Sequence, residues 1–210
     1  MFDNLILNDI KSTRLPEIKV NSTRTLNHDD LVNIDVLART MYGEMASCFK
    51  NGLQYPRAVA RIILNRAEKT SRLKEFSDRP QNLSKPIIAQ VASSPRKFNN
   101  WLIYNSGKKN GPLHQSLCPP KTINAPFWKD NEANSYDIKV WDDAVKIATD
   151  VILNTENFKK ETSELENIFF YTSNMKSYGE KGIYKQVYPK IDNGRSVNNT
   201  KCIELWKENT

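Results

Sequence analysis

The sequence predicts a mainly helical domain that contains one short extended segment. Apolar residues recur at steps of three and four in three stretches, and this spacing is typical of helices with one buried face. A fourth stretch, residues 167–172, reads Asn-Ile-Phe-Phe-Tyr-Thr, and its aromatic and β-branched residues favour a short strand. The chain has 210 residues, of which 39% are hydrophobic and 26% charged, so one folded domain with its own core is expected.

The first helix is expected to begin close to Asn27, because residues that cap helix N-termini occupy positions 27–30. Beyond them, apolar side chains return once per turn as far as Met45, which defines a single buried stripe. The residues of that stripe are Ile34, Leu37, Ala38, Met41 and Met45.

Prolines mark the boundaries of the next two helices. The first of these has Pro56 in its first turn and is expected to end near Glu68. Residues 71–85 are charged and polar and are predicted to form a loop. A short helix then begins at Pro86 and ends before Pro95, since a proline disfavours helical backbone in the residue that precedes it.

A long irregular insertion, residues 105–137, is predicted next. It is rich in glycine and proline, and loops of this length often carry function. The last clear helix is expected over residues 140–153, ahead of the extended segment. We therefore divide the chain into an N-terminal extension (1–32), a main domain (33–188) and a C-terminal tail (189–210) that packs on the core.

Charge and composition restrict the classes of partner. Lys and Arg number 31 against 24 Asp and Glu, and the net charge of +7 favours an anionic partner such as nucleic acid, an acidic membrane surface or a polysaccharide. No apolar run approaches the roughly 18 residues that a membrane-spanning helix needs, so no membrane span is expected. Residues 1–21 lack the pattern of a secretory signal, which predicts synthesis in the cytoplasm without a Sec signal and export by another route.

Cysteine and histidine usage argues against a metal site and against a disulfide framework. Cys48, Cys118 and Cys202 lie far apart and form no Cys-x-x-Cys pair, so free thiols are expected. The two histidines, His28 and His114, lack a second histidine at helical spacing. We therefore expect no metal and no other cofactor.

Glu44 is the candidate catalytic residue of the first helix. At about 100° per residue it lies roughly 20° from Leu37 and about 60° from Met41, on the shoulder of the apolar stripe. A carboxyl group half covered by apolar neighbours has a raised pKa and can donate a proton near neutral pH, as the acid of a glycosidase must. Gly43 beside it leaves room for a sugar to approach. The alternative is an amphipathic helix whose glutamate only borders the core.

Four blocks of sequence occur in order along the chain. They are Leu-Ala-Arg-Thr-Met-Tyr-Gly-Glu at 37–44 with Ile-Ile-Leu-Asn-Arg at 62–66, Pro-Arg-Lys-Phe-Asn-Asn-Trp at 95–101, a helix that starts Trp-Asp-Asp-Ala at 141, and the aromatic block at 167–172. Together they resemble the SleB-type cell-wall hydrolase family, which comprises the spore-cortex-lytic enzymes and their relatives. The resemblance implies a lysozyme-like helical fold that cleaves peptidoglycan between N-acetylmuramic acid (MurNAc) and N-acetylglucosamine (GlcNAc), with the catalytic glutamate at Glu44.

The chain departs from the family pattern at two places. Cys48 stands where many relatives carry a second acidic residue, and the insertion at 105–137 is longer than the family minimum. A mechanism with one acid is therefore favoured, as in lytic transglycosylases, which leave a 1,6-anhydro end. Asp35 lies well before the catalytic glutamate on the same helix. Hydrolysis as in a muramidase stays open if Asp78, Asp130 or another acid faces the catalytic glutamate.

Further site residues are expected around Glu44. Tyr171, in the aromatic block, has a hydroxyl able to bond Glu44 or the acetamido group of the sugar, and its alternative role is a core aromatic. Asn65 and Arg66 are expected to be structural, bonding across helices. Aromatic residues can stack on sugars or wall a cleft, and a lysine can meet the lactyl and peptide carboxylates, although core packing or solvated surface are the alternatives. The substrate-binding candidates are Ser47, Lys97, Phe98, Trp101 and Trp128.

Two other functions stay open at this point. The positive charge fits a nucleic-acid-binding module, although no helix-turn-helix, zinc or RNP-type signature is present, and a wall-binding protein without activity is the second alternative. We expect a monomer that binds peptidoglycan glycan strands and not nucleic acid, in the periplasm or the extracellular cell wall. A phage endolysin, a secreted antibacterial effector and a cortex enzyme all fit, and the producer of an effector needs an inhibitor protein that plugs the cleft.

Overall fold

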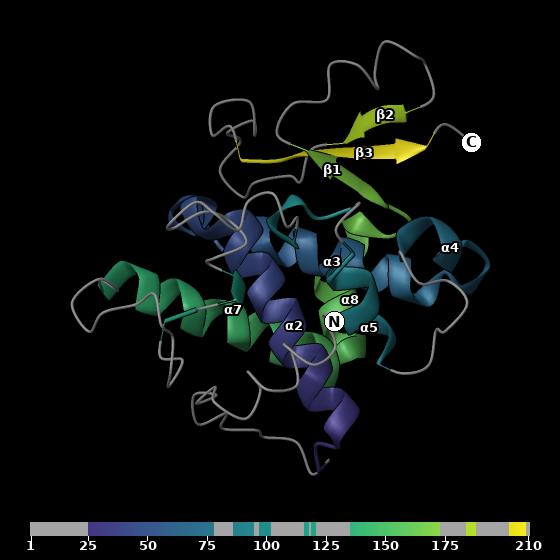
Figure 1. The fold of residues 1–210 in the computed structure, drawn as a ribbon. Coiled ribbons are helices and arrows are strands. Elements are labelled where there is room, and N and C mark those ends of the chain that lie inside the picture. Colours follow the sequence, from purple (N-terminus) through teal and green to yellow (C-terminus); the bar gives the residue numbers. More distant parts are fainter. Residues whose placement is uncertain are drawn as a thin grey trace.

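The computed structural model describes residues 25–77, 86–94, 97–101, 116–117, 119–120, 135–172, 184–187 and 202–208. In these ranges the protein is mainly helical, which confirms the predicted class. Figure 1 shows the helices as one body with a small sheet along one side. None of the helices in the described ranges combines the length and the apolar character that crossing a membrane requires.

The helix α2 (His28–Met45) contacts most of the other helices and begins where the capping residues predicted. The Asn27 side chain accepts a hydrogen bond from the Asp30 N–H at 2.8 Å, and the Asp30 carboxylate accepts one from the Asn27 N–H at 3.1 Å. This reciprocal capping box satisfies two N–H groups that a helix start leaves unpaired. The helix therefore begins inside the expected extension, and a 3-10 helix, η1 (Ala46–Asn51), continues from its end.

The helix α3 (Gln54–Glu68) ends at the residue expected from its apolar stripe. The 3-10 helix η2 (Thr70–Arg72) and a single turn, α4 (Leu73–Phe76), then occupy part of the segment predicted as a loop. Leu73 and Phe76 are buried in the core, and this burial holds a helical turn within an otherwise polar stretch. The loop prediction was wrong for these residues.

Two short helical elements pack on α2. One is α5 (Ile87–Ala92), which also contacts α3, and the other is the 3-10 helix η3 (Asn99–Trp101). The Asn33 side chain of α2 accepts a hydrogen bond from the Ala89 N–H at 2.8 Å. This bond holds α5 against the helix that carries Glu44.

The helix α7 (Ser135–Leu153) packs along α2 and starts within the predicted insertion, five residues before the expected position 140. Tyr42 and Trp141 meet edge to face across this interface, with ring centroids 6.0 Å apart. The helix α8 (Thr155–Glu161) and the 3-10 helix η5 (Ser163–Leu165) follow.

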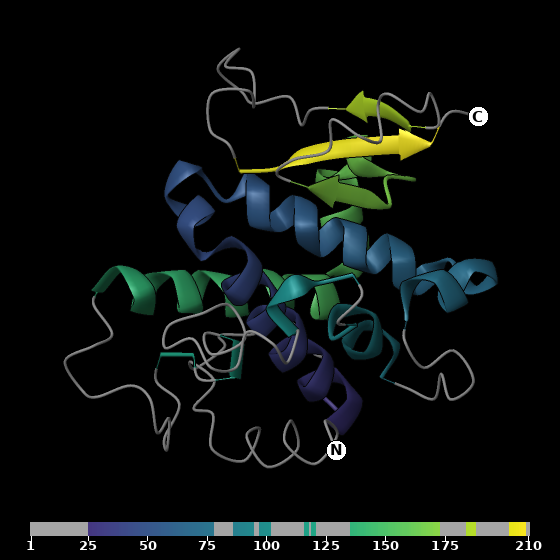
Figure 2. The same ribbon diagram turned by 45° about the horizontal axis from the view of Figure 1, so that its top comes forward.

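A three-stranded antiparallel sheet closes the described part of the fold. Its strands are β1 (Phe170–Thr172), β2 (Tyr184–Val187) and β3 (Glu204–Glu208), in the order β1-β3-β2. Tyr171 stands opposite Leu205 in the β1–β3 register. Figure 2 shows β3, near the C-terminal end of the chain, running between the other two strands.

A disulfide between Cys48 and Cys202 corrects the expectation of free thiols. The two Cα atoms lie 5.6 Å apart, within the range that a disulfide spans, although 154 positions separate the residues in sequence. Cys48 follows α2 in η1, and Cys202 lies two residues before the start of β3. Local spacing indicated no pairing because the fold alone brings these positions together. Cys118 lies outside the described residues.

One hydrophobic core joins the helices to the sheet. Its largest fully buried side chains include Trp101, Trp141, Tyr42, Tyr55, Phe76 and Phe98. Ile203 and Leu205 belong to the same cluster, so the end of the chain packs against the helical body.

Candidate active site

Glu44 lies in the last turn of α2 and is half-buried, as its place on the shoulder of the apolar stripe predicted. Its Oε1 atom accepts a hydrogen bond of 2.9 Å from the backbone N–H of Asn100. Asn100 belongs to η3 and comes 56 positions later in the chain. The protein therefore holds one oxygen of the carboxyl group while the residue stays partly exposed.

Tyr171, on β1, meets the same carboxyl group. Burial raises the pKa of its phenol well above the ordinary value, and the charge of Glu44 and a hydrogen bond with Glu44 raise it further, while Arg66 lowers it. The phenol therefore keeps its proton at neutral pH and donates a hydrogen bond to the Glu44 carboxylate. The Tyr171 ring also packs on Phe98, with centroids 6.2 Å apart. Two donors from different elements thus converge on Glu44.

Thr40, one turn before Glu44, binds Trp101, the residue of η3 that follows Asn100. The indole N–H of Trp101 donates to Thr40 Oγ1 at 3.0 Å, and both side chains are buried. The Thr40 hydroxyl lies 2.8 Å from the carbonyl oxygen of Val36 and 3.1 Å from that of Ala92. Two consecutive residues of η3 are therefore bonded to two residues one turn apart on α2.

The space beside Gly43 is filled by protein and is not open to a sugar. A Cβ atom at this position would overlap Ser116 Oγ and lie 2.9 Å from Asn100 Nδ2. These two side chains are buried and bonded to each other, with 2.6 Å between Asn100 Nδ2 and Ser116 Oγ. Glycine is required here because Asn100 approaches the helix so closely, which corrects the sequence interpretation.

Arg66 lies behind Tyr171 in an aromatic cage. Its Nε donates to the Phe169 carbonyl oxygen at 2.7 Å, and burial lowers its pKa to about 10. Asn65 beside it donates to two carbonyl oxygens of the chain before β1, both at 2.9 Å. Both residues thus have the structural role expected, although their partners are backbone carbonyls before β1 and not another helix. The rings around the Arg66 guanidinium belong to Phe76, Phe98 and Phe170.

The other predicted substrate-binding residues fall into three groups. Phe98 and Trp101 are 0% exposed, so we assign them to the core, where they support Tyr171 and η3, and not to sugar stacking. Ser47 and Lys97 are exposed and accessible to a ligand. Trp128 lies outside the described residues.

Of the three acids that could act as a second carboxyl group beside Glu44, the described ranges include Asp35. Asp35 Oδ2 lies 2.8 Å from Arg39 Nε in a buried ion pair, with 2% and 3% of the two side chains exposed. Arg39 Nη1 also donates to the Leu117 carbonyl oxygen at 2.8 Å. Asp35 therefore serves the core and is not accessible as a second catalytic acid. Asp78 and Asp130 lie outside the described residues.

Sequence reasoning missed Asn100 and Ser116. Asn100 acts on Glu44 through its backbone N–H, which leaves no mark on residue type. The one available signal was Gly43, because a glycine inside a helix often marks a close approach by another part of the chain. That signal was assigned to a ligand and not to the protein.

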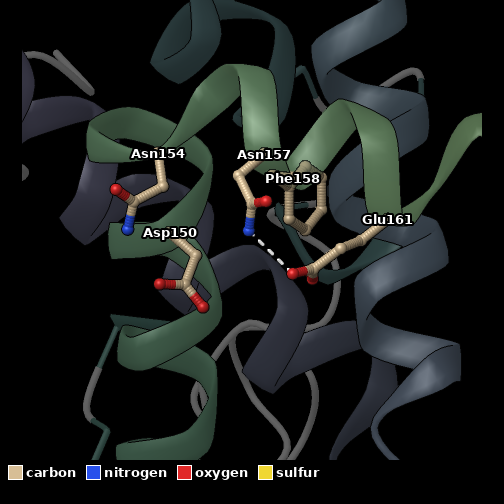
Figure 3. Close-up of a pocket in the computed structure, with 5 residues that line it drawn as sticks. All are labelled: Asp150, Asn154, Asn157, Phe158 and Glu161. Carbon is tan, nitrogen blue, oxygen red and sulfur yellow. Dashed lines mark hydrogen bonds between the residues drawn. The ribbon is translucent and has the colours of Figure 1, made fainter.

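A hollow of about 220 Å³, away from the residues described above, lies over α7 and α8 (Figure 3). Asn157 donates to Glu161 at 2.7 Å within it, and Arg57 forms an ion pair with the same carboxylate. Its lining residues are Asp150, Asn154, Asn157, Phe158 and Glu161. Across the described ranges, no three His, Cys, Asp or Glu side chains gather in a way that would hold a metal ion.

Comparison with known proteins adds no assignment. No protein-family model, no curated protein and no solved structure matches the chain.

Proposed function

We propose that this protein cleaves peptidoglycan glycan strands between MurNAc and GlcNAc as a lytic transglycosylase, with Glu44 as the general acid and base. The observation that carries the proposal is the half-buried Glu44 carboxyl group, held by the Asn100 N–H at 2.9 Å and bonded by the Tyr171 phenol. An acid used in catalysis must be both accessible and oriented, and these contacts provide the orientation. The ordered sequence blocks support a lysozyme-like fold around it.

The reaction requires one proton to be given and one to be taken back. Glu44 donates its proton to the glycosidic oxygen as the bond between that oxygen and MurNAc C1 breaks. The N-acetyl group of the substrate or dipoles of the protein stabilise the positive charge that develops at C1. The Glu44 carboxylate then takes the proton of the MurNAc 6-hydroxyl as O6 attacks C1. The products are a 1,6-anhydro-MurNAc end and a free GlcNAc 4-hydroxyl.

The pairing of Asp35 supports a mechanism with a single acid. Hydrolytic glycosidases use two carboxyl groups that flank the bond to be cleaved. Asp35 is buried in its ion pair with Arg39. Position 48, where many members of the resembled family carry a second acidic residue, is a cysteine in a disulfide. Attack by the substrate's own 6-hydroxyl needs no second carboxylate to activate water.

The Cys48–Cys202 disulfide supports action in the periplasm or the extracellular cell wall. Disulfides persist in oxidising compartments and are rare in the cytosol. Peptidoglycan lies in those same compartments, so substrate and folded enzyme would meet there. An endolysin, a secreted effector that its producer controls with an inhibitor protein, and a cortex enzyme all satisfy this requirement.

Clearing of purified sacculi tests the proposal. The wild-type protein is expected to lower the turbidity, and Glu44→Gln, which keeps the shape but carries no acid proton, to do so on the order of a hundredfold more slowly. Glu164→Gln is the matched control, because Glu164 is exposed on η5, and it should clear at the wild-type rate. Equal clearing by wild type and Glu44→Gln would remove Glu44 from its role. Binding without clearing would identify a non-catalytic wall-binding protein.

Mass spectrometry of the soluble products tests the reaction type. Anhydro-muropeptides, each lighter by one water than the hydrolytic product, are expected. Reducing muropeptides would indicate a muramidase, and released stem peptides would contradict glycan cleavage. A parallel titration with duplex DNA tests the nucleic-acid alternative, in which binding weakens steeply with added salt.

A further inference from the structure

We propose that Asn100 is the positioning residue of the reaction, and that it reserves Glu44 Oε2 as the oxygen that gives and takes back the proton. The inference rests on the proposed function for its catalytic meaning. The contact between Asn100 and Glu44 does not depend on that function, so the two are tested separately.

The hydrogen bond from Asn100 distinguishes the two oxygens of the carboxyl group. A backbone N–H can only donate, so Glu44 Oε1 must be an acceptor at 2.9 Å. In a protonated carboxyl group the carbonyl oxygen is a better acceptor than the hydroxyl oxygen. The proton therefore stays on Oε2 while this bond is present. After the proton leaves, the same bond holds the carboxylate in place for its return.

The side chain of Asn100 is locked, and this fixes the direction of its N–H. It is 1% exposed, its Nδ2 lies 2.6 Å from Ser116 Oγ, and it packs where a Cβ atom on residue 43 would stand. The next residue, Trp101, is bonded to Thr40 one turn before Glu44. The peptide group of Asn100 thus has contacts on both sides that prevent it from turning away.

Packing alone gives no reason for an asparagine at position 100. Within the part of the chain that the structure describes, the buried Asn100 Oδ1 atom has no hydrogen-bond partner. A buried polar atom without a partner lowers stability, so an apolar residue of similar size would be the more stable choice for the core. The bond between Asn100 Nδ2 and Ser116 Oγ, which fixes the direction of the backbone N–H toward Glu44, accounts for the polar residue.

The first measurement needs no substrate. In a proton–nitrogen correlation spectrum followed through the titration of Glu44, the amide proton of residue 100 should move downfield as the carboxylate forms, because it then donates to a charged oxygen. The movement should be absent in Glu44→Gln and smaller in Asn100→Ala. A wild-type amide at residue 100 that ignores the titration overturns the proposal, whether or not the protein cleaves peptidoglycan.

The second measurement uses initial rates on soluble peptidoglycan fragments. Asn100→Ala is expected to lower kcat on the order of tenfold to a hundredfold with little change in KM, because the acid is misplaced while the sugar contacts remain. Ser116→Ala removes the hydrogen-bond partner of the Asn100 side chain and should also lower kcat.

Asn65→Ala is the matched control, since Asn65 is a buried asparagine whose side chain donates to the backbone carbonyls of Leu165 and Ile168. It should lower the melting temperature and leave kcat near the wild-type value. An unchanged kcat in Asn100→Ala, or an equal loss in Asn65→Ala, overturns the proposal. A wild-type protein that does not cleave peptidoglycan overturns the proposed function instead. The spectrum then still shows whether the Asn100 N–H binds the Glu44 carboxyl group.

Discussion

At the level of single residues, the Glu44 carboxyl group is held by two donors from different elements. The Asn100 N–H of η3 and the Tyr171 phenol of β1 both bond to it, while the residue stays partly exposed. A carboxyl group that is both oriented and accessible can give and recover a proton within one reaction cycle. These neighbours on η3 and β1 therefore determine whether the residue can work as acid and base.

Tyr42, two residues before Glu44, gives a residue-scale prediction about pH. Its burial, and then the nearby Asp137 and Tyr136, raise the pKa of its phenol above the ordinary value. Above about pH 10 the unfolded chain releases this proton and the folded protein keeps it, so the free energy of unfolding falls by up to about 1.4 kcal/mol per pH unit. Tyr42→Phe lacks this contribution.

The measurement compares urea unfolding of wild type and Tyr42→Phe at about pH 8 and about pH 11. The difference in unfolding free energy should move in favour of the variant at the higher pH. Tyr171 changes the free energy of unfolding with pH in the same direction as Tyr42, and Arg66 changes it in the opposite direction. Both residues are present in wild type and variant, so their contributions cancel in the comparison. A difference that stays constant across this range would contradict the prediction.

At the scale of secondary-structure elements, the junction of α2 and η3 organises the site. Thr40 and Glu44 lie one turn apart on α2 and accept hydrogen bonds from Trp101 and Asn100 in turn. Because these bonds join residues far apart in sequence, they set the position of η3 along the helix. A substitution at Thr40 should therefore alter the position of η3, and with it the Asn100 N–H that binds Glu44.

Thr40→Val tests this junction. The variant removes the acceptor of the Trp101 indole N–H and leaves that buried donor unpaired, which should lower the free energy of unfolding by about 1–3 kcal/mol. Thr149→Val on α7 is the control, because the buried Thr149 hydroxyl donates to the Val145 carbonyl oxygen of its own helix at 2.8 Å. This variant should lower the free energy of unfolding by about 1 kcal/mol or less. Chemical denaturation measures both, and equal losses would show that the link to η3 contributes little.

At the scale of the whole molecule, the disulfide and the sheet connect the C-terminal part of the described chain to the site. Cys48 lies just past Glu44, and Cys202 leads into β3. The strand β3 pairs with β1 so that Leu205 stands opposite Tyr171. The covalent link and the strand register together hold the Tyr171 phenol next to the carboxyl group that it bonds.

Reduction of this disulfide should lower both stability and activity. For a bridge between residues 154 positions apart, the chain-entropy treatment gives a loss of about 5 kcal/mol at most in the free energy of unfolding. The melting temperature and the rate of clearing of sacculi should fall in dithiothreitol and in Cys48→Ser. Cys118→Ser, the control, should remain sensitive to the reductant. A wild type with the same melting temperature in both redox states would contradict the prediction.

The local features of the fold could be predicted from the sequence. The helical stripes, the start of α2 next to Asn27, the end of α3 at Glu68 and the half-buried position of Glu44 follow from the spacing of residues near one another in the chain. The same reasoning failed for Phe98 and Trp101, because an aromatic side chain looks alike in sequence whether it fills a core or stacks on a ligand. It also failed for α4, whose turn depends on burial against distant residues.

The sequence alone therefore determined the longer helices and identified one candidate acid, since helical periodicity is a property of neighbouring residues. Only the tertiary structure decided what that acid touches. The Asn100 N–H, the Tyr171 phenol and the Cys48–Cys202 bridge reach the end of α2 from far along the chain. Such contacts arise from the packing of whole elements against a shared core, and no local spacing encodes them.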